Sequence, residues 1–130
     1  MLNEVYVFDS SAVLAILANE PGSDYAITRL EGALISSVNL IEVVTRLVDW
    51  GYSTTEISAM LSKLEVRVVD LTETQALVAG HMRKVTRAKG LSLGDRACLA
   101  AGYEGQHKVL TADRAWADID VGVVVEFIRA

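Results

Sequence analysis

Four carboxylates stand at or near the expected starts of helices in this 130-residue chain. They are Asp9, Glu42, Asp95 and Asp113. A cluster of carboxylates is unfavourable because like charges repel and burial opposes ionisation, so it persists where a cation neutralises it. Oxygen-only ligands select hard cations such as Mg²⁺ or Mn²⁺ over zinc. A carboxylate-bound Mg²⁺ also takes phosphate oxygens and activates water, so the predicted chemistry is phosphodiester hydrolysis.

The elements that must position these acids alternate along the chain. Short, largely apolar runs predict strands at residues 5–8, 33–35, 66–69, 108–110 and 123–127. Helical spacing, capping signals and Gly or Pro stops predict helices at residues 10–19, 23–30, 40–50, 53–64, 74–89, 93–103 and 113–118. This alternation predicts an α/β fold with a central parallel sheet and helices on both faces.

In such a sheet, every strand leads into its helix at the same edge, at the carboxyl ends of the strands. Asp9 follows the first strand directly, and Asp113 comes three residues after Leu110, which ends the fourth. Glu42 lies one turn into the helix that follows the second strand. We therefore expect these three acids at one edge, whereas topology must place Asp95 beside them.

Helix capping offers each acid an alternative role. Glu42 could form a capping box with Asn39 and pair with Arg46 one turn later. Asp95 could close a box with Ser92, and the other two acids could be N-caps. Capping does not explain why all four acids fall at one edge, or why one leaves an apolar strand that should be buried.

Composition predicts a single domain over residues 1–130. The apolar share of 52% and the single proline favour a compact core over disorder. We expect no membrane span and no secretory signal. The only cysteine, Cys98, has alanine and leucine neighbours and is expected to pack in the core, which fits a reducing, cytoplasmic location.

The net charge of −5 argues against non-specific nucleic-acid binding by the protein as a whole. Basic residues are nevertheless concentrated in the second half of the chain. Six of them are candidates for a local approach path: Arg83, Lys84, Arg87, Lys89, Arg96 and Arg114. A solvated helix face is the alternative interpretation of this cluster.

Four segments together resemble the PIN-domain family, in particular the VapC toxins of type II toxin–antitoxin pairs. They are residues 7–12 (VFDSSA), 37–43 (SVNLIEV), 91–97 (LSLGDRA) and 110–116 (LTADRAW). The resemblance covers essentially the whole chain, in the family's order. It implies a sheet of about five strands in the order 3-2-1-4-5, which would bring Asp95 to the edge that holds the other acids.

The resemblance also implies roles for individual residues. The four acids fall on the family's acidic quartet, which binds one or two Mg²⁺ or Mn²⁺ ions. Thr111 falls on the hydroxyl residue that helps to order the site, and Asp118 lies where some members keep a further acid. Such toxins cut single-stranded or loop regions of RNA, often transfer or ribosomal RNA. They are held inactive by a VapB-type antitoxin and usually form homodimers; residues 40–64 offer an apolar surface for an antitoxin helix.

Two other functions remain open at this stage. One is a phosphatase or phosphotransferase with Asp9 as nucleophile, although residues 8–11 lack a second aspartate two positions on. The other is a PIN-like module that binds RNA or protein without cutting. His81 and His107 fit no metal-ligand or triad spacing, and the chain has no P-loop.

Overall fold

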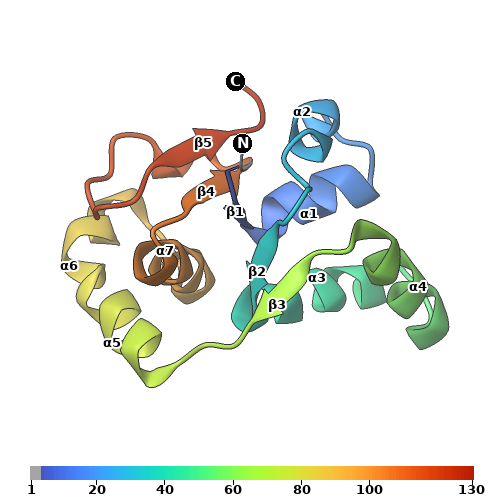
Figure 1. The fold of residues 1–130 in the computed structure, drawn as a ribbon, viewed down its shortest axis with the longest axis horizontal. Helices are drawn as coiled ribbons and strands as arrows, with labels where there is room; N and C mark the ends of the chain where they lie inside the picture. The colour runs from blue at the N-terminus through green and yellow to red at the C-terminus, as the bar shows by residue number, and fades with distance from the viewer. Residues whose placement is uncertain (1–3) are drawn as a thin grey trace.

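A computed structural model describes residues 4–130, and within them it shows a five-stranded, fully parallel sheet (Figure 1). The strands are β1 (Tyr6–Phe8), β2 (Leu34–Ser36), β3 (Arg67–Val69), β4 (Lys108–Thr111) and β5 (Val125–Phe127). Their order is β3-β2-β1-β4-β5, which confirms the expected fold class and strand order. The central strand β1 therefore lies between β2 and β4.

Helices and helical turns connect the strands. They are α1 (Ser10–Leu17), α2 (Ser23–Ile27), α3 (Ser37–Asp49), α4 (Thr54–Leu64), α5 (Glu73–His81), α6 (Arg83–Thr86), η1 (Arg87–Lys89), α7 (Leu93–Gly105) and η2 (Arg114–Trp116). Figure 1 shows α1 to α4 on one side of the sheet and α5 to α7 on the other. No helix in residues 4–130 has the length and apolar character that crossing a bilayer requires.

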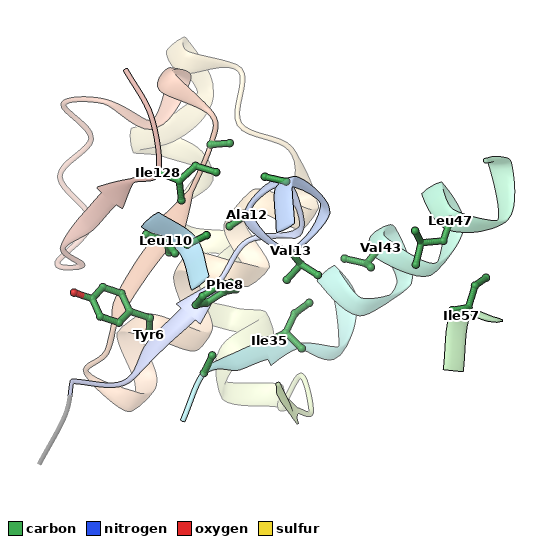
Figure 2. Packing of buried hydrophobic residues seen from close by; sticks show 14 residues of the cluster. Tyr6, Phe8, Ala12, Val13, Ile35, Val43, Leu47, Ile57, Leu110 and Ile128 are labelled. Atoms are coloured by element: carbon green, nitrogen blue, oxygen red, sulfur yellow. The ribbon is translucent and has the colours of Figure 1, made fainter. Parts of the chain in front are cut away.

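The side chains of β1 belong to two hydrophobic clusters, one on each face of the sheet, because successive strand residues point to opposite faces. Tyr6 and Phe8 join a cluster that contains Val13 and extends along α3, as Figure 2 shows. Val7 joins the cluster on the other face, which includes Cys98 and Trp116. The central strands β1, β2 and β4 are buried between the two clusters, which explains why they read as largely apolar runs.

The prediction of one long helix at residues 74–89 is wrong, because the structure divides this range into α5, α6 and η1. The break lies at Met82, whose side chain is buried. The Thr86 hydroxyl donates to the Met82 carbonyl at 2.9 Å, and a hydroxyl bonded to the carbonyl four residues back bends a helix. Likewise, the short helix expected at residues 113–118 is only the 3₁₀ turn η2, closed by buried Trp116.

Helix α3 begins three residues earlier than expected, with Ser36 as its N-cap. Its buried residues are Asn39, Val43 and Leu47, which follow one another at four-residue spacing. Ile41 lies off this buried face and is 65% exposed. The polar Asn39 is drawn inward by hydrogen bonds described below, and this sets which face of α3 is buried.

Candidate metal centre

Asp9 lies at the carboxyl end of the central strand, where β1 passes directly into α1. Its backbone N–H donates to the Leu110 carbonyl at 2.8 Å, so the residue is fixed between β1 and β4. Its side chain is only 2% exposed. Asp9 occupies the N-cap position of α1, yet its carboxylate makes no capping hydrogen bond. Helix capping therefore does not explain this acid.

The Asp9 carboxylate is only half satisfied by protein groups. Its Oδ2 atom accepts hydrogen bonds from Ser11 Oγ at 2.6 Å and from Thr111 Oγ1 at 3.0 Å. Its Oδ1 atom is buried without a hydrogen-bond partner among the described residues. Burial above all, and then the negative charges of Asp95 and Glu42, raise the pKa of Asp9 to about 6. A bound cation would satisfy the free oxygen and lower that pKa.

Thr111 connects the first and fourth acids. It is the last residue of β4 and is completely buried. Its hydroxyl donates to Asp9 Oδ2 and also accepts from the Asp113 backbone N–H at 3.0 Å. The Ser11 hydroxyl lies 3.2 Å away and also accepts from the Ala112 backbone N–H at 2.9 Å. The start of α1 is thereby tied to the end of β4 directly beneath the acids.

Glu42 projects from the second turn of α3. Its Oε1 atom accepts from Asn39 Nδ2 at 2.8 Å and from Ser10 Oγ at 3.0 Å. No ion pair joins Glu42 to Arg46 among the described residues, so that alternative is not realised. The same Asn39 Nδ2 donates to the Gly94 carbonyl at 3.0 Å. Because both neighbours are acceptors, the Asn39 amide must point its nitrogen toward them.

Gly94 lets α7 approach the Glu42 carboxylate. A Cβ at this position would overlap that carboxylate, with Glu42 Cδ only 2.7 Å away. The glycine leaves room for the Glu42 carboxylate, and its backbone does not adopt the left-handed conformation. This close approach brings the start of α7, which carries Asp95, against α3.

Asp95 combines capping with membership of the acidic cluster. Its Oδ2 atom accepts from the Ser92 backbone N–H at 2.8 Å, and Ser92 Oγ accepts from the Asp95 N–H at 3.2 Å. This is a complete capping box. Partial burial first, and then the charges of Asp113 and Glu42, raise the pKa of Asp95. Like-charge repulsion therefore connects Asp95 with all three other acids.

Asp113 is exposed and caps η2, with Oδ1 accepting from the Ala115 N–H at 2.9 Å. Asp118, the further acid suggested by the resemblance, is also exposed, at a left-handed backbone position with φ of 62°. Within residues 4–130, no hydrogen bond or ion pair links Asp118 to the four acids. Charge repulsion thus relates Asp9, Glu42, Asp95 and Asp113 to one another, and no such effect is seen for Asp118 among the described residues.

The donor set of this edge is all oxygen, which suits Mg²⁺ or Mn²⁺. Across residues 4–130, however, no three Asp, Glu, His or Cys side chains converge closely enough to hold an ion. Two carboxylates are turned toward neighbouring donors instead, Glu42 toward Asn39 and Asp95 toward Ser92. The free Asp9 Oδ1 atom and the unused Oε2 atom of Glu42 remain available. The chemistry of these donors therefore fits a hard cation.

The six basic candidates divide into two groups. Arg96 Nη1 donates to the Ala79 carbonyl at 3.0 Å, and the Arg114 guanidinium lies 4.0 Å from the centre of the Phe127 ring. These two arginines therefore have structural partners. The other four, Arg83, Lys84, Arg87 and Lys89, are exposed on α6 and η1, just before the segment that leads to Asp95.

Sequence reasoning missed several residues that hold the acids in place. The sequence gives no role to the hydroxyls of Ser10 and Ser11, which donate to Glu42 and Asp9. It predicts Asn39 only as a capping partner of Glu42, and it gives no role to Gly94. The three-residue spacing from Asn39 to Glu42 was the available signal for a side-chain pair. The contact to Gly94 could not be foreseen, since it spans 55 positions of the chain.

Comparisons with known proteins agree with this fold. Three similar structures are VapBC2 of Rickettsia felis bound to a promoter DNA fragment, DNA-bound VapBC of Salmonella typhimurium and VapBC-5 of Mycobacterium tuberculosis. The first has 16% identity and a TM-score of 0.73, covering 95% of this chain and 98% of its own. The second has 16% identity and a TM-score of 0.72, covering 97% and 99%. The third has 23% identity and a TM-score of 0.60, covering 98% and 100%.

At these identities the structures show a shared fold. A search of curated protein sequences found no significant match. The PIN domain family model, in contrast, matches residues 6–122, which include all four acids and all but the last few residues of the sheet. The chain therefore belongs to the PIN domain family.

Proposed function

We propose that this protein is a metal-dependent endoribonuclease, the VapC-type toxin of a toxin–antitoxin pair. The observation that carries the proposal is the Asp9 carboxylate: buried at the sheet edge, raised in pKa, and left with one oxygen free. A carboxylate in this state destabilises the fold unless a cation or a proton neutralises it. The three other acids around it supply more negative charge than one proton removes.

The residues that would hold the cation are Asp9, Glu42, Asp95 and Asp113. When bound, Mg²⁺ or Mn²⁺ supplies an activated water and stabilises the leaving oxygen of a phosphodiester. The protein's contribution is to fix the acids before the substrate arrives. Thr111 and Ser11 orient Asp9 through hydrogen bonds to one oxygen, which leaves the other oxygen free to bind the ion.

RNA is the proposed substrate, and a basic approach path is needed because the protein carries a net charge of −5. The exposed residues of α6 and η1 supply four cations: Arg83, Lys84, Arg87 and Lys89. These four cations precede the capping box that positions Asp95, so an RNA backbone that they bind would lead toward the acids. An RNA substrate and the buried free thiol of Cys98 both fit a cytoplasmic location.

The proposed protein partner is a VapB-type antitoxin. Several similar structures are VapBC complexes, and they span nearly the whole of this chain. Helix α3 also exposes apolar side chains that the core does not use: Ile41 is 65% and Val48 56% exposed. An amphipathic antitoxin helix laid along α3 and α4 would cover them. A homodimer is proposed on the family resemblance.

The test is cleavage of a labelled transfer or ribosomal RNA by protein separated from any antitoxin. Cleavage should require Mg²⁺ or Mn²⁺, stop with EDTA, and fall by at least ~100-fold in Asp9→Asn, since loss of a catalytic metal ligand removes several kcal/mol of transition-state stabilisation. Exposed Asp70→Asn is the matched control and should cut normally. Cleavage that persists both in EDTA and in Asp9→Asn would refute the proposal.

A further inference from the structure

A small polar pocket opens beside the acids, between the start of α1 and the last turns of α3. Its volume is about 210 Å³. Its lining residues are Ser10, Ser11, Leu14, Glu20, Arg46 and Trp50. The proposed metal site and the basic residues of α6 and η1 give no role to two of these lining residues, Arg46 and Trp50.

Two hydroxyls join the pocket to the acids. Ser10 Oγ donates to Glu42 Oε1 at 3.0 Å, and Ser11 Oγ donates to Asp9 Oδ2 at 2.6 Å. A group held in the pocket would therefore be separated from two of the four carboxylates by a single side chain. This is the position of a subsite next to the phosphate that is cut.

Arg46 supplies a cation to this pocket. It is exposed on α3, one turn after Glu42, and no hydrogen bond or ion pair engages it among residues 4–130. Glu42 is satisfied by Asn39 and Ser10 instead. Unlike Arg96 and Arg114, this guanidinium is available to a ligand. Glu20, also in the lining, lies 3.8 Å from the Arg129 guanidinium, which partly offsets its charge.

Trp50 supplies an aromatic face. It lies at the end of α3, four residues after Arg46, so the two side chains emerge on the same side of the helix. The other tryptophan, Trp116, is 1% exposed in the core, whereas Trp50 is 44% exposed. An exposed indole beside an unpaired guanidinium is the combination with which proteins hold an unstacked base and its phosphate.

We infer that this pocket binds one unpaired nucleotide of an RNA strand, with its base on Trp50 and a neighbouring phosphate on Arg46. The inference rests on the proposed ribonuclease function and names the residues that would hold a nucleotide beside the phosphate that is cut. A base inside a duplex is stacked on its neighbours and cannot lie on an indole. The pocket would seat this nucleotide while the adjoining phosphate faces the acids.

The experiment is fluorescence anisotropy of a short labelled single-stranded RNA, with Asp9→Asn as the parent protein so that the RNA stays intact. Adding Trp50→Ala should weaken binding by ~5- to 100-fold, the range expected for loss of one stacked base. Trp50→Phe should stay within ~3-fold of the parent, because it retains an aromatic face. Arg46→Ala should weaken binding and reduce the slope of log affinity against log salt by ~0.7.

Tyr52→Ala and Arg67→Ala are matched controls. Tyr52 is a neighbouring exposed aromatic residue outside the pocket lining, and Arg67 is an exposed cation at the start of β3. Both should bind RNA like the parent. Equal binding by Trp50→Ala and its parent would overturn the inference. Loss of antitoxin binding with unchanged RNA binding in that variant would overturn it too, and would give the pocket to the antitoxin.

The proposed function is tested separately, by measuring RNA cleavage with the wild-type protein. If the wild type cuts RNA and the Trp50 and Arg46 variants bind it normally, the subsite alone is refuted. If the wild type cuts no RNA but the variants lose binding as expected, the ribonuclease proposal falls and the nucleotide site stands.

Discussion

Replacing Asp9 with asparagine should stabilise the metal-free protein, although it removes the residue at the centre of the site. The native state holds the Asp9 pKa at about 6 against 3.8 for an unperturbed carboxyl, mainly through burial. The native protein therefore binds this proton more tightly than the unfolded chain does. As pH rises from about 4 to 6, the free energy of unfolding falls, by about 3 kcal/mol in all.

Asparagine is neutral at every pH in this range and so avoids that loss. Its carboxamide oxygen can still accept from Ser11 and Thr111, as Oδ2 of Asp9 does. Its NH₂ group then occupies the place of the unpartnered Oδ1, and an unsatisfied buried donor costs about 1–2 kcal/mol. The net gain at about pH 7.5 is therefore about 1–2 kcal/mol, or about 4 to 7 °C in Tm for a chain of this length.

The assay is thermal unfolding in EDTA at two pH values, with exposed Asp70→Asn as control. At about pH 4.5 native Asp9 is already protonated, so the advantage of the variant should shrink by about 2 kcal/mol and disappear. Saturating Mg²⁺ should raise the Tm of the wild type but not of Asp9→Asn. An Asp9→Asn Tm at or below the wild type at about pH 7.5, or an advantage independent of pH, would refute the reasoning.

Two further predictions concern the surroundings of the acids. Gly94→Ala places a methyl group where the Glu42 carboxylate lies, so the end of that side chain must move away from Asn39 and Ser10. The loss of these hydrogen bonds should cost about 1 kcal/mol of stability and reduce the Mg²⁺-induced stabilisation, and the shorter Glu42→Asp should partly restore stability in the double variant. Gly80→Ala, where a methyl group meets nothing within 4 Å, is the control and should be neutral or stabilising, and equal Tm values for the two alanine variants would contradict the argument. Cys98 is completely buried, and burial above all, followed by the charge of Asp9, raises the pKa of its thiol. A disulfide reagent such as DTNB should therefore label Cys98 only after denaturation. Rapid labelling of the native protein would contradict this packing.

Much of this fold could be foreseen because its signals are local. The apolar run that ends at Asp9 marks a buried strand passing into a helix. The capping boxes at Ser53 and Ser92 are visible as four-residue patterns and are present in the structure. The break at Met82 was not foreseen, because it depends on burial of that residue and on the backward hydrogen bond of Thr86.

The candidate site shows the same division. The sequence by itself placed three of the acids at the sheet edge, since Asp9 and Asp113 follow β1 and β4 and Glu42 lies in the helix after β2. Only the tertiary structure decided how those acids are held. Asp9 is oriented by Thr111, 102 positions away, and Asp95 reaches the cluster because Asn39 and Gly94 join α3 to α7.

The arginines also show the difference between what the sequence predicts and what the packing decides. Composition pointed to the second half of the chain, where Arg96 and Arg114 turned out to have structural partners. Arg46, which the sequence suggested only as a partner of Glu42, remains unpaired beside the acids in residues 4–130. A sequence pattern records charge and spacing along one element, whereas the availability of a charged group depends on which distant donors and acceptors the packing of the elements brings to it.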